Sequence, residues 1–125
     1  MSWYVDSSAI LSVIFGEGPG TNLSKVFKNG AITSELSRVE VLRNVTKVDT
    51  TLIPSAEKLL EQFDFIMISQ GVLRRASEYP QDIRSKTLDA IHLATAETLQ
   101  PLIDGIVTFD KGMAKDAQYL NLVVY

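Results

Sequence analysis

The chain has 125 residues, of which 46% are hydrophobic and 22% are charged, the composition of an ordinary globular protein. We expect a single domain covering residues 1–125. The absence of cysteine excludes disulfides, zinc–thiolate sites and cysteine nucleophiles, and a lone His92 excludes a multi-histidine metal site. Any bound metal must therefore have mainly oxygen ligands, which favours Mg²⁺ or Mn²⁺.

The formal net charge of −3 gives no general attraction for nucleic acid. A local basic surface is still compatible with the sequence, because several cations fall close together: Lys25, Lys28, Arg38, Arg43 and Lys47. No basic segment precedes an apolar signal run, and no apolar stretch is long enough to span a membrane. We therefore expect a cytoplasmic protein with no membrane partner.

The chain opens with a short run of large β-forming residues that ends at a carboxylate. Trp3, Tyr4 and Val5 are consecutive, as in a strand that is covered on both faces, and Asp6 follows them. Ser7 or Ser8 can cap the next helix. Asp6 is thus predicted at the carboxyl end of a buried strand, where open α/β sheets bind their ligands.

Helical and extended patterns then alternate along the chain. Helices are predicted at 9–15, 21–27, 35–47 with Ser34 as its cap, 55–63, 72–76 with Ser69 as its cap, 88–99 and 113–119. Turns or loops are expected at Asn29–Gly30 and 81–85, and further strands at 31–33, 65–68, 105–109 and 122–124. This order predicts an α/β fold, a three-layer α/β/α sandwich with a central parallel sheet.

Most acidic side chains lie on polar helix faces and need no special explanation. Those expected to be solvated include Glu57, Glu61, Glu78, Asp82, Glu97 and Asp116. Asp89 is different, because it shares a helix face with Leu93 and Ala96 and has no cation three or four residues after it. The alternative is a first-turn aspartate that is favoured by the helix dipole and paired with Arg84 or Lys86.

Three more acids are candidates for the same site, each with a simpler alternative. Asp6 and Asp110 both follow predicted strands, but each could merely cap the helix that comes next. Glu40 lies near Arg43 and Lys47 on its helix, so an ion-paired polar face would also explain it.

Two neutral or weakly basic side chains accompany these acids. Thr108, two residues before Asp110, could face the crevice and orient a water molecule, although packing is its default role. His92 lies on a mostly apolar helix, which is more typical of a buried histidine with satisfied hydrogen bonds than of a catalyst. We therefore leave His92 outside the predicted catalytic set.

Four segments of the chain resemble the PIN domain family. Val5–Leu11 is similar to the opening block of the family, and Ser34–Arg43 is similar to its second block, with Glu40 at the acidic position. Leu88–Ala96 resembles the third block and Val107–Asp110 the fourth. The blocks occur in the family's order and cover essentially the whole chain. A short chain of this kind most resembles the VapC-type toxins of toxin–antitoxin pairs.

The resemblance implies a function and a site. It implies a ribonuclease that is a homodimer and that is blocked by an antitoxin protein. It assigns the binding of Mg²⁺ or Mn²⁺ to an acidic quartet, and Thr108 falls where the family often has Ser or Thr. The quartet is Asp6, Glu40, Asp89 and Asp110.

The expected reaction is hydrolysis of an RNA phosphodiester bond by water that a divalent cation activates. Such a reaction leaves 5′-phosphate and 3′-hydroxyl ends and needs no protein nucleophile. The overall negative charge of the chain implies that a local basic rim or a dimer groove holds the RNA. The alternative is a catalytically silent PIN-like module that only binds RNA or a partner protein.

Overall fold

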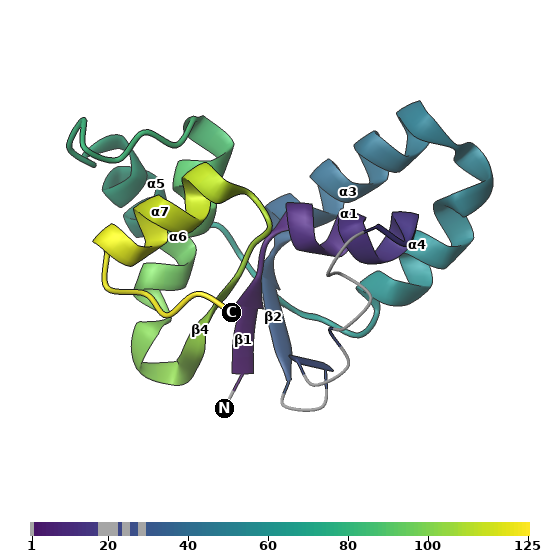
Figure 1. Ribbon diagram of the computed structural model, residues 1–125, viewed down its shortest axis with the longest axis horizontal. Coiled ribbons are helices and arrows are strands. Elements are labelled where there is room, and N and C mark those ends of the chain that lie inside the picture. The colour runs from purple at the N-terminus through teal and green to yellow at the C-terminus, as the bar shows by residue number, and fades with distance from the viewer. Residues whose placement is uncertain (1, 18–22, 24–25, 28–29) are drawn as a thin grey trace.

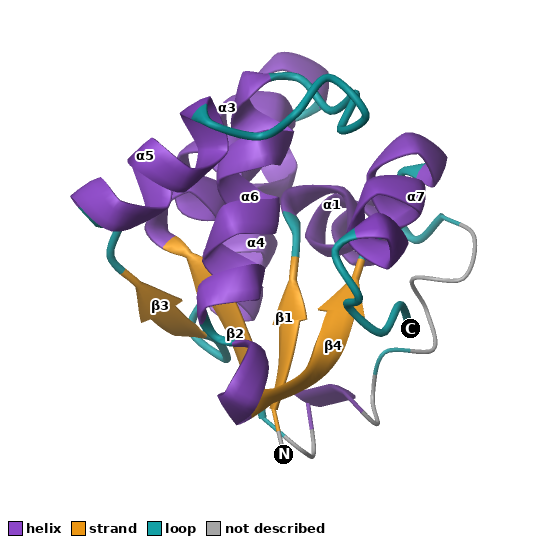
Figure 2. Cartoon of the chain, turned by 90° about the vertical axis from the view of Figure 1, so that its left-hand side faces the viewer, coloured by secondary structure: helices purple, strands orange, loops and turns teal. Residues whose placement is uncertain are grey.

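A computed structural model describes residues 2–17, 23, 26–27 and 30–125 of the chain. Its centre is a four-stranded sheet in which every pairing is parallel and the strand order is β3-β2-β1-β4 (Figure 2). The strands are β1 Ser2–Val5, β2 Ala31–Ser34, β3 Asp64–Ile66 and β4 Ile103–Val107. The predicted central parallel sheet is confirmed.

Helices cover both faces of this sheet. They are α1 Ser7–Phe15, α3 Glu35–Val48, α4 Ile53–Leu60, α5 Gln70–Ser77, α6 Thr87–Thr98 and α7 Lys111–Tyr119, with short 3₁₀ helices η2 Thr50–Leu52 and η3 Gln100–Leu102. Figure 1 shows α1, α3 and α4 on one side of the sheet and α5, α6 and α7 on the other. This arrangement is the predicted three-layer sandwich.

The two layers exist because neighbouring strand residues point to opposite faces. In β1, Tyr4 packs in the cluster formed with α6 and α7, whereas Val5 packs in the cluster formed with α1, α3 and α4. Ile106 and Val107 repeat this division in β4. All four side chains are fully buried, so an unbroken apolar strand does predict a sheet that is covered on both faces.

Helix caps agree with the sequence at Ser34 and Ser69, whereas the start of α1 decides between two expectations. The Ser34 hydroxyl accepts from the Leu36 amide at the start of α3, and Ser69 caps α5 in the same way. For α1, the prediction of Ser7 or Ser8 as the cap is wrong. Asp6 is the cap, as the simpler alternative for this residue predicted, because its carboxylate accepts the Ala9 amide at 3.0 Å.

The C-terminal strands differ from the prediction in their extent. The strand expected at 105–109 is β4, Ile103–Val107, so Thr108 lies beyond its end. The strand expected at 122–124 is reduced to a single bridge between Val124 and Ile106. Gly105 permits this approach, since a Cβ at that position would lie 2.2 Å from the Val123 carbonyl oxygen.

Other boundaries differ by a few residues. The helix expected at 55–63 is α4, which begins at Ile53 because Pro54 suits a first helical turn. The strand expected at 65–68 is β3, Asp64–Ile66. The helix expected at 21–27, the turn at Asn29 and the cations Lys25 and Lys28 fall wholly or partly outside the described residues.

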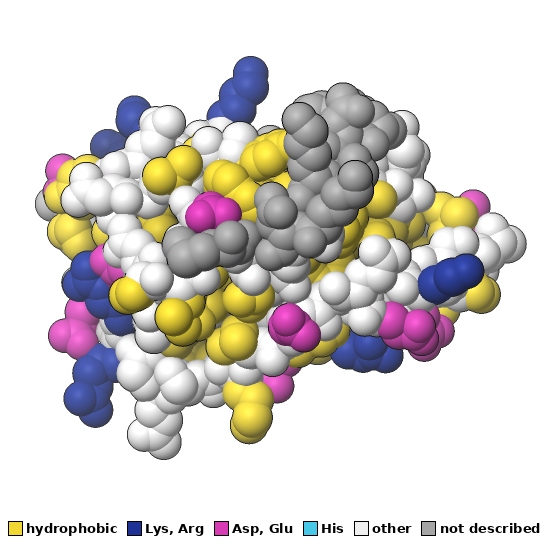
Figure 3. Space-filling view, turned by 90° about the horizontal axis from the view of Figure 1, so that it is seen from below, with side chains coloured by type: hydrophobic (Ala, Val, Ile, Leu, Met, Phe, Trp, Pro, Cys, Tyr) yellow, Lys and Arg dark blue, Asp and Glu magenta, His cyan; other side chains and the backbone are white. Residues whose placement is uncertain are grey.

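All four strands run in the same direction, so their carboxyl ends form one edge of the sheet (Figure 2). Figure 3 views the opposite side, from below, where apolar side chains are exposed between scattered charged ones. None of the helices in the described part of the chain has the length and apolar character needed to cross a membrane.

Candidate active site

Asp6 is the most deeply buried of the four predicted acids. It follows β1 at the carboxyl edge of the sheet, and only 2% of its surface is exposed. One carboxylate oxygen, Oδ1, accepts from the Ala9 amide at 3.0 Å and the Ser8 hydroxyl at 2.7 Å. Burial raises the pKa of Asp6 above its ordinary value, although the hydrogen bonds from Thr108, Ala9 and Ser8 and the proximity of His92 oppose the rise.

Thr108 connects the end of β4 to Asp6. Its buried hydroxyl donates to Asp6 Oδ2 at 2.6 Å and accepts from the Asp110 amide at 3.2 Å. The Ser8 hydroxyl in turn accepts from the Phe109 amide at 3.2 Å. Both Asp6 oxygens are therefore held by the two segments that leave β1 and β4, which fixes the orientation of this carboxylate.

Glu40 lies on α3 and reaches across to α6. Its Oε1 is 2.5 Å from Nε2 of His92, a fully buried side chain. The Tyr4 hydroxyl lies 2.6 Å from the other ring nitrogen, Nδ1. Burial, followed by the charge of Asp6, raises the pKa of Tyr4 well above its ordinary value, so the phenol keeps its proton at neutral pH. The Tyr4 hydroxyl and the Glu40 carboxylate thus engage the two ring nitrogens of His92.

These contacts test what the sequence predicted for His92 and for Glu40. The prediction that His92 is a buried, satisfied residue is confirmed, because both ring nitrogens have partners. The alternative explanation of Glu40 is wrong. Among the described residues, no ion pair joins it to Arg43 or Lys47, and its partner is His92 on another helix.

The pKa of Asp89 is affected by the charges of the other three acids. Asp89 lies in the first turn of α6 and is half-buried. Its pKa is raised first by burial, then by the negative charges of Asp110 and Asp6, with a smaller contribution from Glu40, while His92 opposes the rise. The fold thus brings acids from four distant segments near one another. The proposed partners Arg84 and Lys86 form no ion pair with Asp89 in the described structure.

Asp110 has two structural roles. Its Oδ1 accepts from the Met113 amide at 2.9 Å, so it caps α7, as the simpler alternative predicted. It also lines, together with Asp89, a hollow of about 300 Å³. A second hollow of about 370 Å³ lies between Glu40 and Asp89. Asp89 therefore borders both hollows, and the site is an open cleft at the sheet edge.

The donor set suits a hard divalent cation by its chemistry. It consists of four carboxylates with no sulfur ligand, and their mutual repulsion is what a cation relieves. As the side chains stand, the described residues contain no group of three or more Asp, Glu or His close enough to hold a metal ion. Asp6, Glu40 and Asp110 are each engaged by neighbouring hydrogen-bond donors.

Sequence reasoning missed some contributors to this site. Ser8 holds Asp6, and its spacing of two residues after an aspartate was an available signal. Tyr4 gave no such signal, because its contact with His92 joins positions 88 residues apart. Asp116 was expected to be solvated but is only 4% exposed. It shares an α7 face with Met113, which could have indicated burial.

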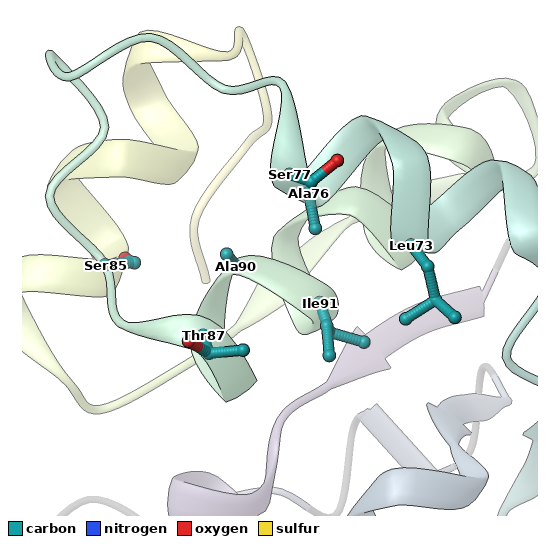
Figure 4. A pocket seen from close by; sticks show the side chains of 7 residues that line it. All are labelled: Leu73, Ala76, Ser77, Ser85, Thr87, Ala90 and Ile91. Atoms are coloured by element: carbon teal, nitrogen blue, oxygen red, sulfur yellow. The ribbon is translucent and has the colours of Figure 1, made fainter.

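A further hollow of about 350 Å³ lies between α5 and α6. Figure 4 shows its lining side chains: Leu73, Ala76 and Ser77 from α5, Thr87, Ala90 and Ile91 from α6, and Ser85 from the segment that leads into α6. None of these side chains is an acid, base or metal ligand of the kind that the candidate reaction needs. The candidate chemistry therefore belongs to the acidic cleft.

Comparisons with known proteins agree with this geometry. The PIN domain family model matches residues 3–117. Ribonuclease VapC46 of Mycobacterium tuberculosis (strain ATCC 25618 / H37Rv) is 31% identical, covering 97% of this chain and 94% of its own. Ribonuclease VapC35 of Mycobacterium tuberculosis (strain CDC 1551 / Oshkosh) is 30% identical, covering 97% of this chain and 93% of its own.

Solved structures share the fold. A toxin–antitoxin complex from Klebsiella pneumoniae contains a chain with a TM-score of 0.73 and 24% identity, covering 92% of this chain and 89% of that one. VapBC2 from Rickettsia felis, bound to a DNA fragment from its promoter, gives a TM-score of 0.78 at 15% identity, covering 100% and 98%. The sequence matches extend over nearly the whole chain and include every acid of the cleft. The chain therefore belongs to the PIN domain family, among the VapC ribonucleases.

Proposed function

We propose that this chain is a metal-dependent endoribonuclease and the toxin of a VapBC-type toxin–antitoxin pair. The observation that supports the proposal is that Asp89 borders two hollows, shared with Asp110 and Glu40, and that the charges of Asp6, Glu40 and Asp110 all raise its pKa. These four carboxylates would hold Mg²⁺ or Mn²⁺. When bound, the cation supplies Lewis-acid stabilisation of the phosphate oxygens and activation of water.

The side chains around the cleft leave water as the attacking group. The hydroxyls of Ser8 and Thr108 are committed to Asp6, and His92 is fully buried with both ring nitrogens engaged. None of them is placed as a nucleophile or as a base that reaches the ribose 2′-hydroxyl. Cleavage then breaks the bond from phosphorus to the ribose 3′-oxygen and leaves 5′-phosphate and 3′-hydroxyl ends.

Each residue has a separate task in this proposal. Asp6 and Asp89 would be direct ligands, and Glu40 and Asp110 would ligate directly or through water. Thr108 and Ser8 fix the two oxygens of Asp6, so its position is set before the substrate binds. His92, buried on α6, holds Glu40 by a hydrogen bond in the same manner.

The test is cleavage of an end-labelled single-stranded RNA by the purified chain, with Mg²⁺, Mn²⁺ or EDTA. We expect cleavage with either metal, none with EDTA, and fragments that carry 5′-phosphate. Asp89→Asn should lose activity while its circular dichroism spectrum is unchanged. Glu61→Gln, which removes an exposed acid from the end of α4, is the matched control and should cleave normally. Fragments with a cyclic phosphate would contradict the mechanism.

A manganese titration followed by thermal unfolding separates this function from a catalytically silent PIN-like module. Binding to the native state alone raises the free energy of unfolding by about 2.7 kcal/mol at 100 times the dissociation constant. An enzyme of the proposed kind should show this stabilisation. A silent module should show no shift.

The proposal includes two protein partners. The helices α3, α5 and α6 carry large exposed apolar side chains, namely Val39, Leu73 and Leu88, which a partner would cover. We expect a homodimer, with a mass by light scattering of twice 13.8 kDa. We also expect the protein of the adjacent reading frame to inhibit cleavage in the cytoplasm. A monomeric mass at micromolar concentration would exclude the dimer.

A further inference from the structure

The segment from Arg84 to Lys86 forms one wall of the acidic cleft. Together with Ser85 it lines the hollow that contains Asp89 and Asp110. Lys86 also lines the neighbouring hollow, which contains Glu40 and Asp89. The side chains of Arg84 and Lys86 are exposed. Two cations therefore stand at the rim of a cleft whose interior is acidic.

A buried carboxylate holds this segment in place. Asp116 of α7 is only 4% exposed, and its Oδ2 accepts three hydrogen bonds. The donors are the Arg84 amide at 3.1 Å, the Ser85 amide at 2.8 Å and the Ser85 hydroxyl at 2.6 Å. Ile83, just before the segment, is buried in the core beside α6 and α7. The backbone from 83 to 86 is thus fixed at both ends, because α6 begins at Thr87.

The two rim cations form no ion pair with a carboxylate of the described residues. Within the part of the chain that the structure describes, ion pairs of lysine or arginine with a carboxylate are those of Arg75 with Glu97, at 2.8 Å, and of Arg38 with Glu57, at 3.9 Å. Arg84 and Lys86 form none, although acids line the same hollows. Their charges are therefore available to a ligand.

An RNA strand that enters this cleft needs such cations. The chain has a net charge of −3, and the cleft itself concentrates negative charge, so both repel phosphate. Phosphate contacts by Lys and Arg supply most of the affinity for single-stranded nucleic acid. A divalent cation in the cleft can engage the phosphate that is cut, but not those on either side of it.

We propose that Arg84 and Lys86, presented by the Asp116-anchored segment, bind the phosphates of the RNA backbone next to the bond that is cut. This inference rests on the proposed ribonuclease function and adds where the substrate strand lies. The strand passes over the start of α6, with Lys86 between the two hollows and Arg84 toward α7. An arginine suits a bidentate phosphate contact, and a lysine acts as a point charge.

The experiment compares two double variants with the same change in net charge. Arg84→Gln/Lys86→Gln removes the rim cations. Arg74→Gln/Lys58→Gln removes an exposed arginine from α5 and an exposed lysine from α4, neither of which lines an acid-bearing hollow. Binding of a fluorescent single-stranded RNA is measured by anisotropy in EDTA over a range of salt concentrations, and kcat/KM is measured with Mg²⁺ over the same range.

Each lost phosphate contact lowers the slope of log affinity against log salt by about 0.7 for single strands. The rim variant should therefore show a slope about 1.4 smaller than that of the parent, with a matching loss of salt dependence in kcat/KM. The control variant should keep the parent's slope. Asp116→Asn, which weakens the anchor but keeps both cations, should give an intermediate slope.

The outcomes separate this inference from the function on which it rests. If the parent cleaves RNA and both double variants keep its slope, the rim is not the phosphate site and the inference is overturned. An equal loss in the rim and control variants would also overturn it, because the effect would then be one of net charge. If the parent neither binds nor cleaves RNA, the proposed function itself fails.

Discussion

Replacement of Asp6 by asparagine tests whether the cleft uses the charge of this residue or only its shape. As a cap, asparagine equals aspartate, so its oxygen can still accept the Ala9 amide at the start of α1. Its amide group then faces Thr108, whose oxygen can accept from it. The threonine proton retains Met113 Sδ as a nearby acceptor, at 3.7 Å. The fold is therefore expected to survive.

The size of the effect follows from what each substitution removes. Asp6→Ala loses the cap, which costs about 0.5–2 kcal/mol of folding stability. Asp6→Asn keeps the cap and removes a buried charge, so the metal-free variant should unfold at the parent's temperature or above it. With Mn²⁺ at 100 times its dissociation constant, the parent gains about 2.7 kcal/mol, or about 10 °C for a chain of this length, and the variant should gain almost nothing.

Differential scanning fluorimetry with and without Mn²⁺ measures both quantities, and an RNA cleavage assay accompanies it. Asp6→Ala serves as the comparison, because it should lose both metal stabilisation and intrinsic stability. The reasoning is refuted if Asp6→Asn keeps the parent's Mn²⁺-dependent shift or its cleavage rate. A metal-free Asp6→Asn variant that is unfolded at 25 °C would contradict the expectation that asparagine keeps the cap of α1 and the fold.

Three further predictions concern stability. Gly105→Ala should destabilise the protein by at least about 2 kcal/mol, because its Cβ would overlap a backbone carbonyl of the C-terminal segment. Its control, Gly71→Ala in α5, should stabilise by about 0.5–1 kcal/mol, because the added Cβ meets nothing closer than 3.7 Å. Urea unfolding measures both changes. Tyr4→Phe leaves the Nδ1 of buried His92 without its hydrogen-bond partner and should cost about 1–3 kcal/mol; equal urea midpoints for variant and parent would contradict this contact. The folded-state pKa of Asp89 is raised above the ordinary 3.8, so its contribution to stability is present below that pH and is lost as the pH rises through the folded value. In EDTA, Asp89→Asn should therefore gain stability over the parent as the pH rises from about 4, and a constant difference would exclude the shift.

Much of this protein could be predicted because the relevant signals are local. A run of three β-formers that ends in Asp6 predicts a covered strand with an acid at its carboxyl end, and that is where Asp6 lies. Parallel strands share a carboxyl edge, so strand direction places Asp6 and the β4–α7 connection at the same edge, and the pairing of β1 with β4 makes them neighbours. The start of α6 at Thr87, with Asp89 in its first turn, is visible in the apolar pattern of the helix.

Sequence patterns failed where contacts join distant segments. An acid on a helix with nearby cations predicts a solvated ion pair, yet Glu40 is bound by His92, 52 residues away. Asp116 resembles a surface residue, but in the fold it anchors a segment 31 residues earlier in the chain. Local periodicity says which face of a helix is apolar, but it does not say which polar groups another element brings to that face.

The sequence by itself indicated the α/β class and a parallel sheet, because these depend on residue type and on spacing within one element, and its resemblance to the PIN family singled out the four acids. Only the tertiary structure decided which donors fix each carboxylate, which acids raise the pKa of Asp89, and which cations stand free at the rim. Those properties depend on distances between elements. These distances are set when the two helical layers pack against the faces of the sheet.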